Sequence, residues 1–275
     1  MSTELERPAQ ARYMPPDYAI SLAAKGGTDR WLHNPGRERV QSMAGFEDTY
    51  IDIVDYILRI THRIWEQKDI GYIYDTYRHN SHVNDDMGLQ YGRDKIVADT
   101  VHTINAFPDV RLYADEVIWA GDDVRGFHTS HRTVIIGRNT GFSRYGPPTG
   151  KKVVLWCVAN CTALANEIFE EWVIYDTAAL LNQLGFDVRE KAREYGNLLG
   201  STAVLSRRTG EHDRLLGQGK PAQLPPAPTG GFDVEDFLRR HYHYLWNWRN
   251  LSRVDGDCAA GLRFRGSTDR VLYGR

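Results

Sequence analysis

One segment of this chain occurs twice, and this internal repeat constrains the fold more than any other feature. Residues 52–70 align with residues 233–251 at one constant offset, which pairs Asp55 with Asp236, Arg59 with Arg240, His62 with His243, Trp65 with Trp246 and Lys68 with Arg249. One inserted residue then brings Tyr91-Gly92-Arg93 onto Tyr273-Gly274-Arg275. Self-similarity indicates a repeated structural unit. We therefore expect one complete module, which carries any chemistry, and the opening of a second.

Composition excludes several classes of partner. Of the 275 residues, 25% are charged and 41% are hydrophobic, and the formal net charge is -2, so nothing favours a nucleic acid partner. No apolar run approaches the roughly 20 residues that span a membrane, and the first residues lack the basic and apolar regions of an export signal. We expect a soluble cytoplasmic protein without a membrane partner. Cys157, Cys161 and Cys258 form no CxxC motif and are expected to be thiols.

The pattern of apolar residues predicts helices first and strands second. Residues 1–45 are rich in proline and glycine and are expected to form an extended N-terminal arm. A stripe then follows at helical spacing, and it predicts a long helix with one apolar face: Ile53, Ile57, Ile60 and Ile64. A short strand is expected at residues 77–84, and a second helix at residues 93–106.

Four consecutive strands are expected at residues 110–119, 123–138, 151–164 and 168–175, where the apolar period falls to two. A capping aspartate, Asp176, and a glycine stop, Gly185, bound a short closing helix. Residues 46–190 therefore predict an α+β domain in which a curved antiparallel sheet holds the first helix in its concave face.

The remaining chain is expected to form a linker at residues 191–231 and the partial second copy at residues 232–275. The helix of that copy has an apolar stripe with no sheet to cover it: Phe237, Leu238, Leu245 and Trp246. A bare stripe of this size is a liability in water. We therefore expect the helix to dock on the complete module or on another chain.

Several short runs in residues 46–187 resemble one family. They are Phe107-Pro108-Asp109-Val110-Arg111, Val117-Ile118-Trp119-Ala120-Gly121-Asp122-Asp123, Pro147-Pro148-Thr149-Gly150-Lys151 and Glu170-Glu171-Trp172-Val173-Ile174-Tyr175-Asp176. In this order and spacing they are similar to the SnoaL-like polyketide cyclase and ester cyclase group of the nuclear-transport-factor-2-like superfamily. The resemblance implies a cone-shaped α+β barrel around one deep pocket. It is specific for fold rather than for reaction, because this superfold hosts many activities.

Asp176 is the first candidate for catalysis. In the cyclases that the chain resembles, an aspartate near the end of the last strand acts as general acid/base, and Asp176 occupies the matching place. If Trp172 and Ile174 share its strand face, apolar surroundings would disfavour its charged form. The alternative is that Asp176 only caps the helix that follows.

His131 is the second catalytic candidate. His128 and His131 are three apart on a strand and so face opposite sides, and we favour His131 as the one inside the cone. Phe127 and Thr129 share its face and are expected to bind substrate. A neutral imidazole there could polarise a carbonyl or relay a proton. A histidine bonded only to its sheet neighbours is the alternative.

Further substrate-binding residues are expected on the strands and at the mouth of the cone. They are His82 and Asn84 on the first strand, Asn160 and Trp172 on the last two strands, and Tyr91. His79-x-x-His82 followed by Asp85-Asp86 does not supply a tetrahedral ligand set, so neither a metal nor another cofactor is expected.

These residues favour an enzyme in which Asp176 removes a proton beside a carbonyl of a hydrophobic small-molecule ligand, as in a polyketide or ester cyclase-like isomerase or lyase. One alternative is a non-catalytic ligand-binding or oligomerisation module, with a homo-oligomer formed by sheet-mediated pairing. Another is a hydrolase that uses activated water and needs a second acid.

Overall fold

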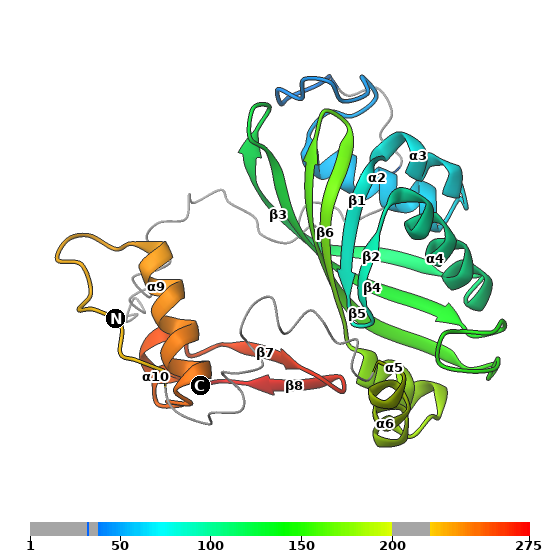
Figure 1. The fold of residues 1–275 in the computed structure, drawn as a ribbon. Helices are drawn as coiled ribbons and strands as arrows, with labels where there is room; N and C mark the ends of the chain where they lie inside the picture. The colour runs from blue at the N-terminus through cyan, green and yellow to red at the C-terminus, as the bar shows by residue number, and fades with distance from the viewer. Residues whose placement is uncertain (1–31, 33–37, 200–220) are drawn as a thin grey trace, which may run out of the picture. The chain divides into compact units, whose positions relative to one another are not determined.

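The computed structural model describes residue 32, residues 38–199 and residues 221–275 (Figure 1). Most of the expected N-terminal arm and residues 200–220 of the expected linker lie outside the described residues. The chain divides into two compact units. Most described residues before Gly196 belong to the larger unit, and residues 221–266 and 270–275 belong to the smaller one.

Helix α2 (Ile53–Trp65) is the predicted first long helix. It begins where Asp52 accepts a hydrogen bond of 2.7 Å from the backbone N–H of Asp55, which satisfies one of the unpaired donors of the first turn. All four isoleucines of the predicted stripe are buried. The helical spacing therefore placed the core face correctly.

The segment after α2 forms the first edge of the sheet. A 3₁₀ turn, η2 (Ile70–Tyr72), and the short helix α3 (Ile73–Thr76) lead into strands β1 (Tyr77–Asp85) and β2 (Gly88–Tyr91), and helix α4 (Arg93–Ala106) follows. Strand β1 runs antiparallel to β2, with His82 opposite Tyr91.

The four predicted strands are β3 (Arg111–Asp122), β4 (Gly126–Arg138), β5 (Lys152–Leu164) and β6 (Glu167–Tyr175), joined in sequence as antiparallel neighbours. The whole sheet has the order β2-β1-β6-β5-β4-β3. The class is α+β, as predicted, but β6 pairs with β1 in parallel, so the sheet is mixed rather than antiparallel. The reason is that α4 carries the chain to the far edge, from which three hairpins return it to β1.

The sheet is curved but is not closed into a barrel, because β2 and β3 remain its two edges. Helices α2 and α4 lie over its concave side (Figure 1). Beyond β6, helix α5 (Thr177–Leu184) ends at Gly185 with a φ of 86°, the left-handed conformation that glycine adopts without strain, and α6 (Val188–Leu199) follows. The largest core cluster joins α2 to the inner face of the sheet.

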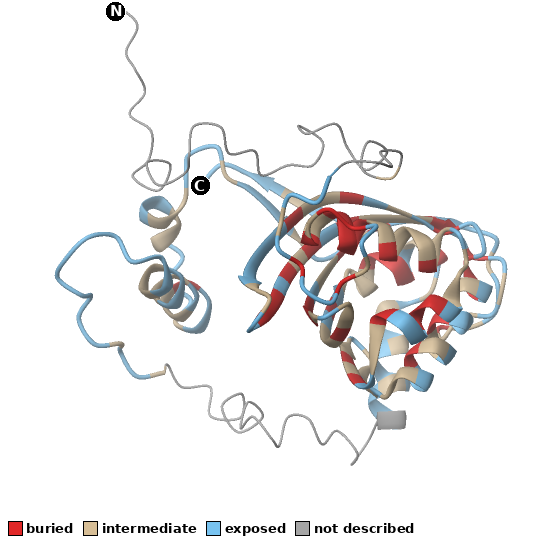
Figure 2. Cartoon of the chain, turned by 90° about the horizontal axis from the view of Figure 1, so that it is seen from above, coloured by how far each residue is buried: buried red, intermediate tan, exposed pale blue. Residues whose placement is uncertain are grey.

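The smaller unit contains helix α9 (Val234–His241), a π-helical turn η4 (Tyr242–Asn247), helix α10 (Arg253–Asp257), and the hairpin of β7 (Arg263–Gly266) and β8 (Arg270–Tyr273). Figure 2 shows buried residues gathered in the larger unit. Of the stripe expected on this helix, Leu238 and Trp246 are exposed, whereas Leu245 is buried. Among the described residues, no helix combines the length and the apolar character needed to cross a membrane.

Candidate active site

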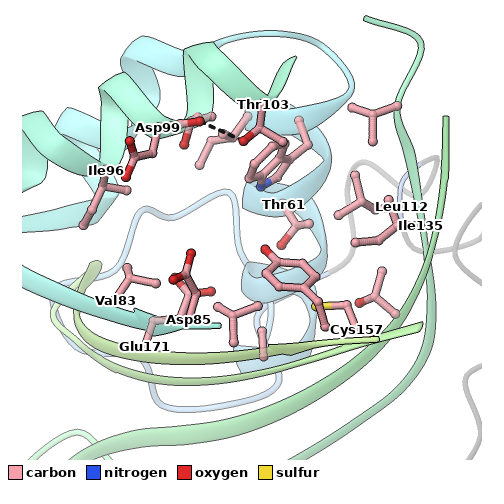
Figure 3. Close-up of a pocket in the computed structure, with 18 of the residues that line it drawn as sticks. Thr61, Val83, Asp85, Ile96, Asp99, Thr103, Leu112, Ile135, Cys157 and Glu171 are labelled. Carbon is pink, nitrogen blue, oxygen red and sulfur yellow. Dashed lines mark hydrogen bonds between the residues drawn. The ribbon is translucent and has the colours of Figure 1, made fainter. Parts of the chain in front are cut away.

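A cavity of about 200 Å³ lies between α2, α4 and the concave face of the sheet (Figure 3). Most of its walls are apolar, with contributions from α2, from β3 to β5 and from α5: Ile57, Ile60, Ile64, Leu112, Ile135, Val153, Leu155 and Leu180. Polar and ionisable side chains gather at the end of β1, in the turn after it, on β6 and in the loop before β5: Asp85, Asp86, Glu171, Tyr175, Arg144 and Tyr145. A cavity of this kind suits a small, mostly hydrophobic ligand with one reacting polar group.

The middle of strand β5, beyond Val153 and Leu155, forms a trough in this cavity, because its inward residues there are small: Cys157, Ala159 and Cys161. His131 stands on one side of the trough, since it lies opposite Ala159 on β4. Glu171 stands on the other side, since it lies opposite Cys161 on β6. The two ionisable groups are therefore separated by a strand whose side chains leave space for a ligand.

Glu171 is the most chemically distinctive residue of the cavity. Figure 3 shows its carboxyl group beside that of Asp85, both turned toward the cavity. The Tyr77 hydroxyl donates a hydrogen bond of 2.9 Å to Glu171 Oε2. Burial raises the pKa of Glu171, the hydrogen bonds from Tyr77 and Cys161 oppose this effect, and the charge of Asp85 adds to it. The net result is a carboxyl group that keeps its proton to higher pH than an ordinary glutamic acid.

The side chain of Asp85 accepts hydrogen bonds from several donors. Arg144 Nη1 lies 3.2 Å from Asp85 Oδ2, and that side chain of Asp85 is only 5% exposed. Gln90 Nε2 and the backbone N–H of Met87 each donate to it at 2.8 Å. Burial alone would lower the pKa of Arg144. The negative charge of Asp85 and further contacts outweigh this effect, so the pKa of Arg144 is raised and its guanidinium stays charged.

A second set of polar side chains, Asp86, Tyr145 and Thr177, follows Asp85 and Arg144. Tyr145 donates a hydrogen bond of 3.4 Å to Asp86 Oδ2, and the Thr177 hydroxyl donates to the same oxygen. Burial raises the pKa of Tyr145 and also that of Tyr175, so both phenols are protonated at neutral pH. Tyr145 already donates its proton to Asp86, so Tyr175 is the phenol that can donate a hydrogen bond to a ligand.

His131 lines the cavity, as the sequence predicted, and is 4% exposed. Burial lowers its pKa to about 4, so its imidazole is neutral at pH 7. Its Nε2 atom is buried and has no hydrogen-bond partner among the residues that the structure describes. A buried polar atom without a partner is costly, and a ligand atom in the trough could supply the missing partner.

Asp176 is placed differently from the prediction. Its side chain accepts a hydrogen bond of 3.1 Å from the backbone N–H of Ala179 and so caps α5, which was the alternative interpretation. It is not among the residues that line the cavity. The physical reason is strand parity: Glu171, Val173 and Tyr175 face the cavity, so the alternate residues Trp172 and Ile174 face outward.

The same parity places other predicted residues outside the cavity. His82, Asn84 and Asn160 do not line it, because Val83 and Asp85 face inward on β1, and Cys157, Ala159 and Cys161 do so on β5. His82 Nε2 instead lies 3.4 Å from Glu170 Oε1. Trp172 and Tyr91 are 53% and 65% exposed, and neither borders the cavity.

Phe127 and Thr129 do share the inward face of β4 with His131, as expected, and both are buried. They belong to the packed core rather than to the cavity wall. The Phe127 ring packs edge-on against Phe46 and Trp119, and Thr129 donates to the carbonyl of Cys161 at 3.5 Å.

Sequence reasoning missed Asp85, Glu171, Arg144 and Tyr175. Two features of the sequence together could have predicted that Glu171 faces inward. The small residues that alternate on β5 mark its inner face, and hairpin pairing transfers that face to β6. Among the described residues, no group of three or more histidine, cysteine, aspartate or glutamate side chains is arranged to hold a metal ion.

Comparison with known proteins shows what the larger unit is similar to. The model of the SnoaL-like polyketide cyclase family matches residues 55–184. A structure described as a "Putative SnoaL-like polyketide cyclase" from Jannaschia sp. CCS1 is similar at 17% identity, with 48% of this chain and 90% of that chain covered and a TM-score of 0.43. TsrD from Streptomyces laurentii is similar at 15% identity, with 48% and 94% covered and a TM-score of 0.42.

A protein from Catenulispora acidiphila, described as having a ketosteroid isomerase-like fold and solved in complex with trimethylamine, is similar at 16% identity. The match covers 48% of this chain and 93% of that one, with a TM-score of 0.40. No curated protein matches the sequence. The match to the SnoaL-like polyketide cyclase family thus covers residues 55–184, just under half of the chain, and these residues lie within the larger unit.

Proposed function

We propose that this domain is a small-molecule cyclase or isomerase in which Glu171 is the general acid/base for a hydrophobic carbonyl substrate. The observation that carries the proposal is the environment of Glu171: a carboxyl group with a raised pKa at the floor of a mostly apolar cavity. A general acid/base works best when its pKa approaches the working pH. We assign this role to Glu171 in place of Asp176, because Asp176 caps α5 and does not border the cavity.

The reaction that these groups support begins with removal of a proton. Glu171, as carboxylate, takes a proton from the carbon beside a substrate carbonyl, and the electrons of the broken C–H bond move onto the carbonyl oxygen as an enolate. In an isomerisation the proton returns to another atom of the same substrate. In a ring closure the enolate carbon forms a bond to a second carbonyl carbon, and Glu171 returns its proton to the new alkoxide. Only protons and electron pairs move, so the scheme requires no cofactor.

His131 is suited to hold the enolate oxygen. Its imidazole is neutral, its Nε2 atom has no partner within the described chain, and the trough of β5 separates it from Glu171. In the tautomer that carries hydrogen on Nε2 it donates a hydrogen bond to the oxygen as negative charge develops. Tyr175 faces the same cavity and offers a second donor.

Hydrolysis by an activated water is a second candidate, which the position of Asp85 favours. That interpretation needs a second carboxyl group near the acid, and Asp85 lies beside Glu171 (Figure 3). Hydrolysis consumes a water molecule, whereas cyclisation by ring closure and isomerisation do not. Hydrolysis incorporates ¹⁸O from labelled water into the product, whereas the proposed cyclisation or isomerisation does not.

Solvent deuterium exchange tests the proposal without knowledge of the natural substrate. A panel of hydrophobic cyclic ketones and 1,3-diketones is incubated with the protein in D₂O, and loss of the α-proton is followed by NMR. The wild-type protein is expected to accelerate exchange of at least one probe, and Glu171→Gln to reduce that rate on the order of 10²–10⁴-fold.

Asp176→Asn is the matched control, because asparagine also caps helices. It is expected to exchange the same probe at close to the wild-type rate. If Asp176→Asn abolishes exchange while Glu171→Gln does not, the assignment of the base to Glu171 is wrong.

A further inference from the structure

The smaller unit reproduces the first part of the SnoaL-like domain element by element. Helix α9 with η4 begins at Val234, the residue that the sequence repeat aligns with Ile53 at the start of α2. Asp233 caps this helix as Asp52 caps α2. The ion pair on the helix is also kept: Arg59 lies 3.1 Å from Asp55, and its counterpart Arg240 lies 2.7 Å from Asp236.

The backbone that follows the helix is repeated as well. Lys68 and its counterpart Arg249 both adopt left-handed conformations, with φ of 63° and 57°. Before the hairpin, Tyr77 N–H donates to Ile73 O, and at the equivalent place Cys258 N–H donates to Val254 O.

The two hairpins have the same register. His82 lies opposite Tyr91 in the first, and Arg263 lies opposite Tyr273 in the second, so the inserted residue of the repeat falls in the turn. Both hairpins end at a glycine with positive φ, Gly92 at 87° and Gly274 at 83°. Each glycine donates its N–H back across the hairpin, to Ser81 O in the first copy and to Leu262 O in the second.

The copies differ in what covers the helix. Ile53 and Ile57 are 0% and 2% exposed, whereas their counterparts Val234 and Leu238 are 60% and 46% exposed. The same face continues through Tyr242 and Trp246, which are also exposed. Part of the face that is core in the first copy is thus exposed in the second, from Val234 to Trp246, whereas Leu245, the counterpart of Ile64, remains buried.

In the first copy, the apolar face of helix α2 is covered by the sheet of the larger unit. Helix α2 packs against the sheet that contains β3 to β6, and β1 lies between β2 and β6. Within residues 221–275, β7 and β8 form a sheet of two strands, and no counterpart of α4 or of β3 to β6 is present. A two-stranded hairpin alone is marginally stable, and within residues 221–275 no further strand extends this sheet over the helix.

We propose that residues 233–275 are a docking surface for a polypeptide segment equivalent to residues 93–175, namely one helix and a four-stranded antiparallel meander. The partner's sheet covers the stripe from Val234 to Trp246, and its last strand lies parallel to β7. Charge on the flanks of α9 supports a protein partner. Glu235 pairs with Arg239 and Asp236 with Arg240, so this helix lacks the basic face that anionic membranes attract.

A longer protein tests this inference. Residues 94–185 are appended a second time after Arg275, which the repeat aligns with Arg93, so the added segment continues the second copy in its native order. In this protein we expect the amides of α9 to gain hydrogen-exchange protection of at least 100-fold and the Trp246 fluorescence to shift to shorter wavelength.

Matched variants identify the surface that is covered. Leu238→Lys is expected to abolish the added protection in the extended protein and to leave the melting temperature of the original chain nearly unchanged. Arg239→Ala, on the flank of the same helix, is expected to preserve the protection.

Two results would overturn the inference. One is an α9 that exchanges equally fast with and without the added segment. The other is a dimer of the original chain, seen by sedimentation, that Leu238→Lys dissociates, because a second copy would then be the occupant. Neither outcome depends on the proposed role of Glu171.

Discussion

Glu171 combines two properties that rarely occur together in a carboxyl group: access to a cavity and removal from bulk water. The small residues of β5 leave space in front of it, and the Tyr77 hydroxyl fixes its direction. Asp85 adds a negative charge nearby, while Arg144 keeps that charge in place. The raised pKa of Glu171 therefore follows from the packing of β1, β5 and β6 together, and not from its own sequence neighbours.

His131 gives the stability of the domain a predictable dependence on pH. Its pKa is about 4 in the folded protein and 6.5 in the unfolded chain, so the unfolded chain binds more protons between these values. The free energy of unfolding therefore falls as pH decreases from about 6.5 to about 4. The loss from this residue is at most about 3.5 kcal/mol, since one pKa unit corresponds to about 1.4 kcal/mol.

Chemical denaturation at a series of pH values measures this effect. His131→Leu is expected to lose less stability than the wild-type protein between pH 7 and pH 4, and the exposed control His128→Leu is expected to behave like wild type. Equal losses in all three proteins would show that His131 does not titrate as described.

The face of each strand decides which of its residues reach the cavity. The sequence did not predict these faces correctly for β1, β5 and β6. The helical stripe of α2 and the existence of β3 to β6 could be predicted, because periodicity is a local property. Which face of β6 is inside could not, since both Trp172 and Val173 are apolar and only pairing with β5 settles the choice. The same limitation hid Asp85 on β1.

Asp176 is expected to contribute stability through helix α5. Asp176→Ala removes the hydrogen bond to the N–H of Ala179 and should lower the free energy of unfolding by about 1 kcal/mol. Asp176→Asn should lower it by clearly less. Thermal melts of the three proteins measure this difference, and a large loss in the asparagine variant would indicate that the carboxylate charge matters beyond capping.

At the scale of the whole molecule, the chain joins a domain with its own core to a smaller unit that repeats the beginning of that domain. The three clusters of core residues lie between Met43 and Leu184, so the domain has a complete interior of its own. Sheet-mediated pairing of two copies stays a prediction, to which the exposed Trp172 and Ile174 on the outer face of β6 lend support.

A chain shortened to residues 1–199 is therefore expected to fold. Calorimetry should show one cooperative transition with a midpoint within a few degrees of that of the domain in the full chain, and near-ultraviolet circular dichroism should report fixed aromatic side chains. A broad transition without an aromatic signal would show that the domain needs residues beyond 199.

The ionisation of Glu171 is the central claim of this account, and carbon-13 NMR measures it directly. The side-chain carboxyl resonance, assigned by its absence in Glu171→Gln, is followed as pH is raised. We expect a midpoint clearly above the ordinary value of 4.5, and a lower midpoint in Asp85→Asn, because a neighbouring negative charge has been removed. A midpoint at or below 4.5 in the wild-type protein would contradict the proposed acid/base.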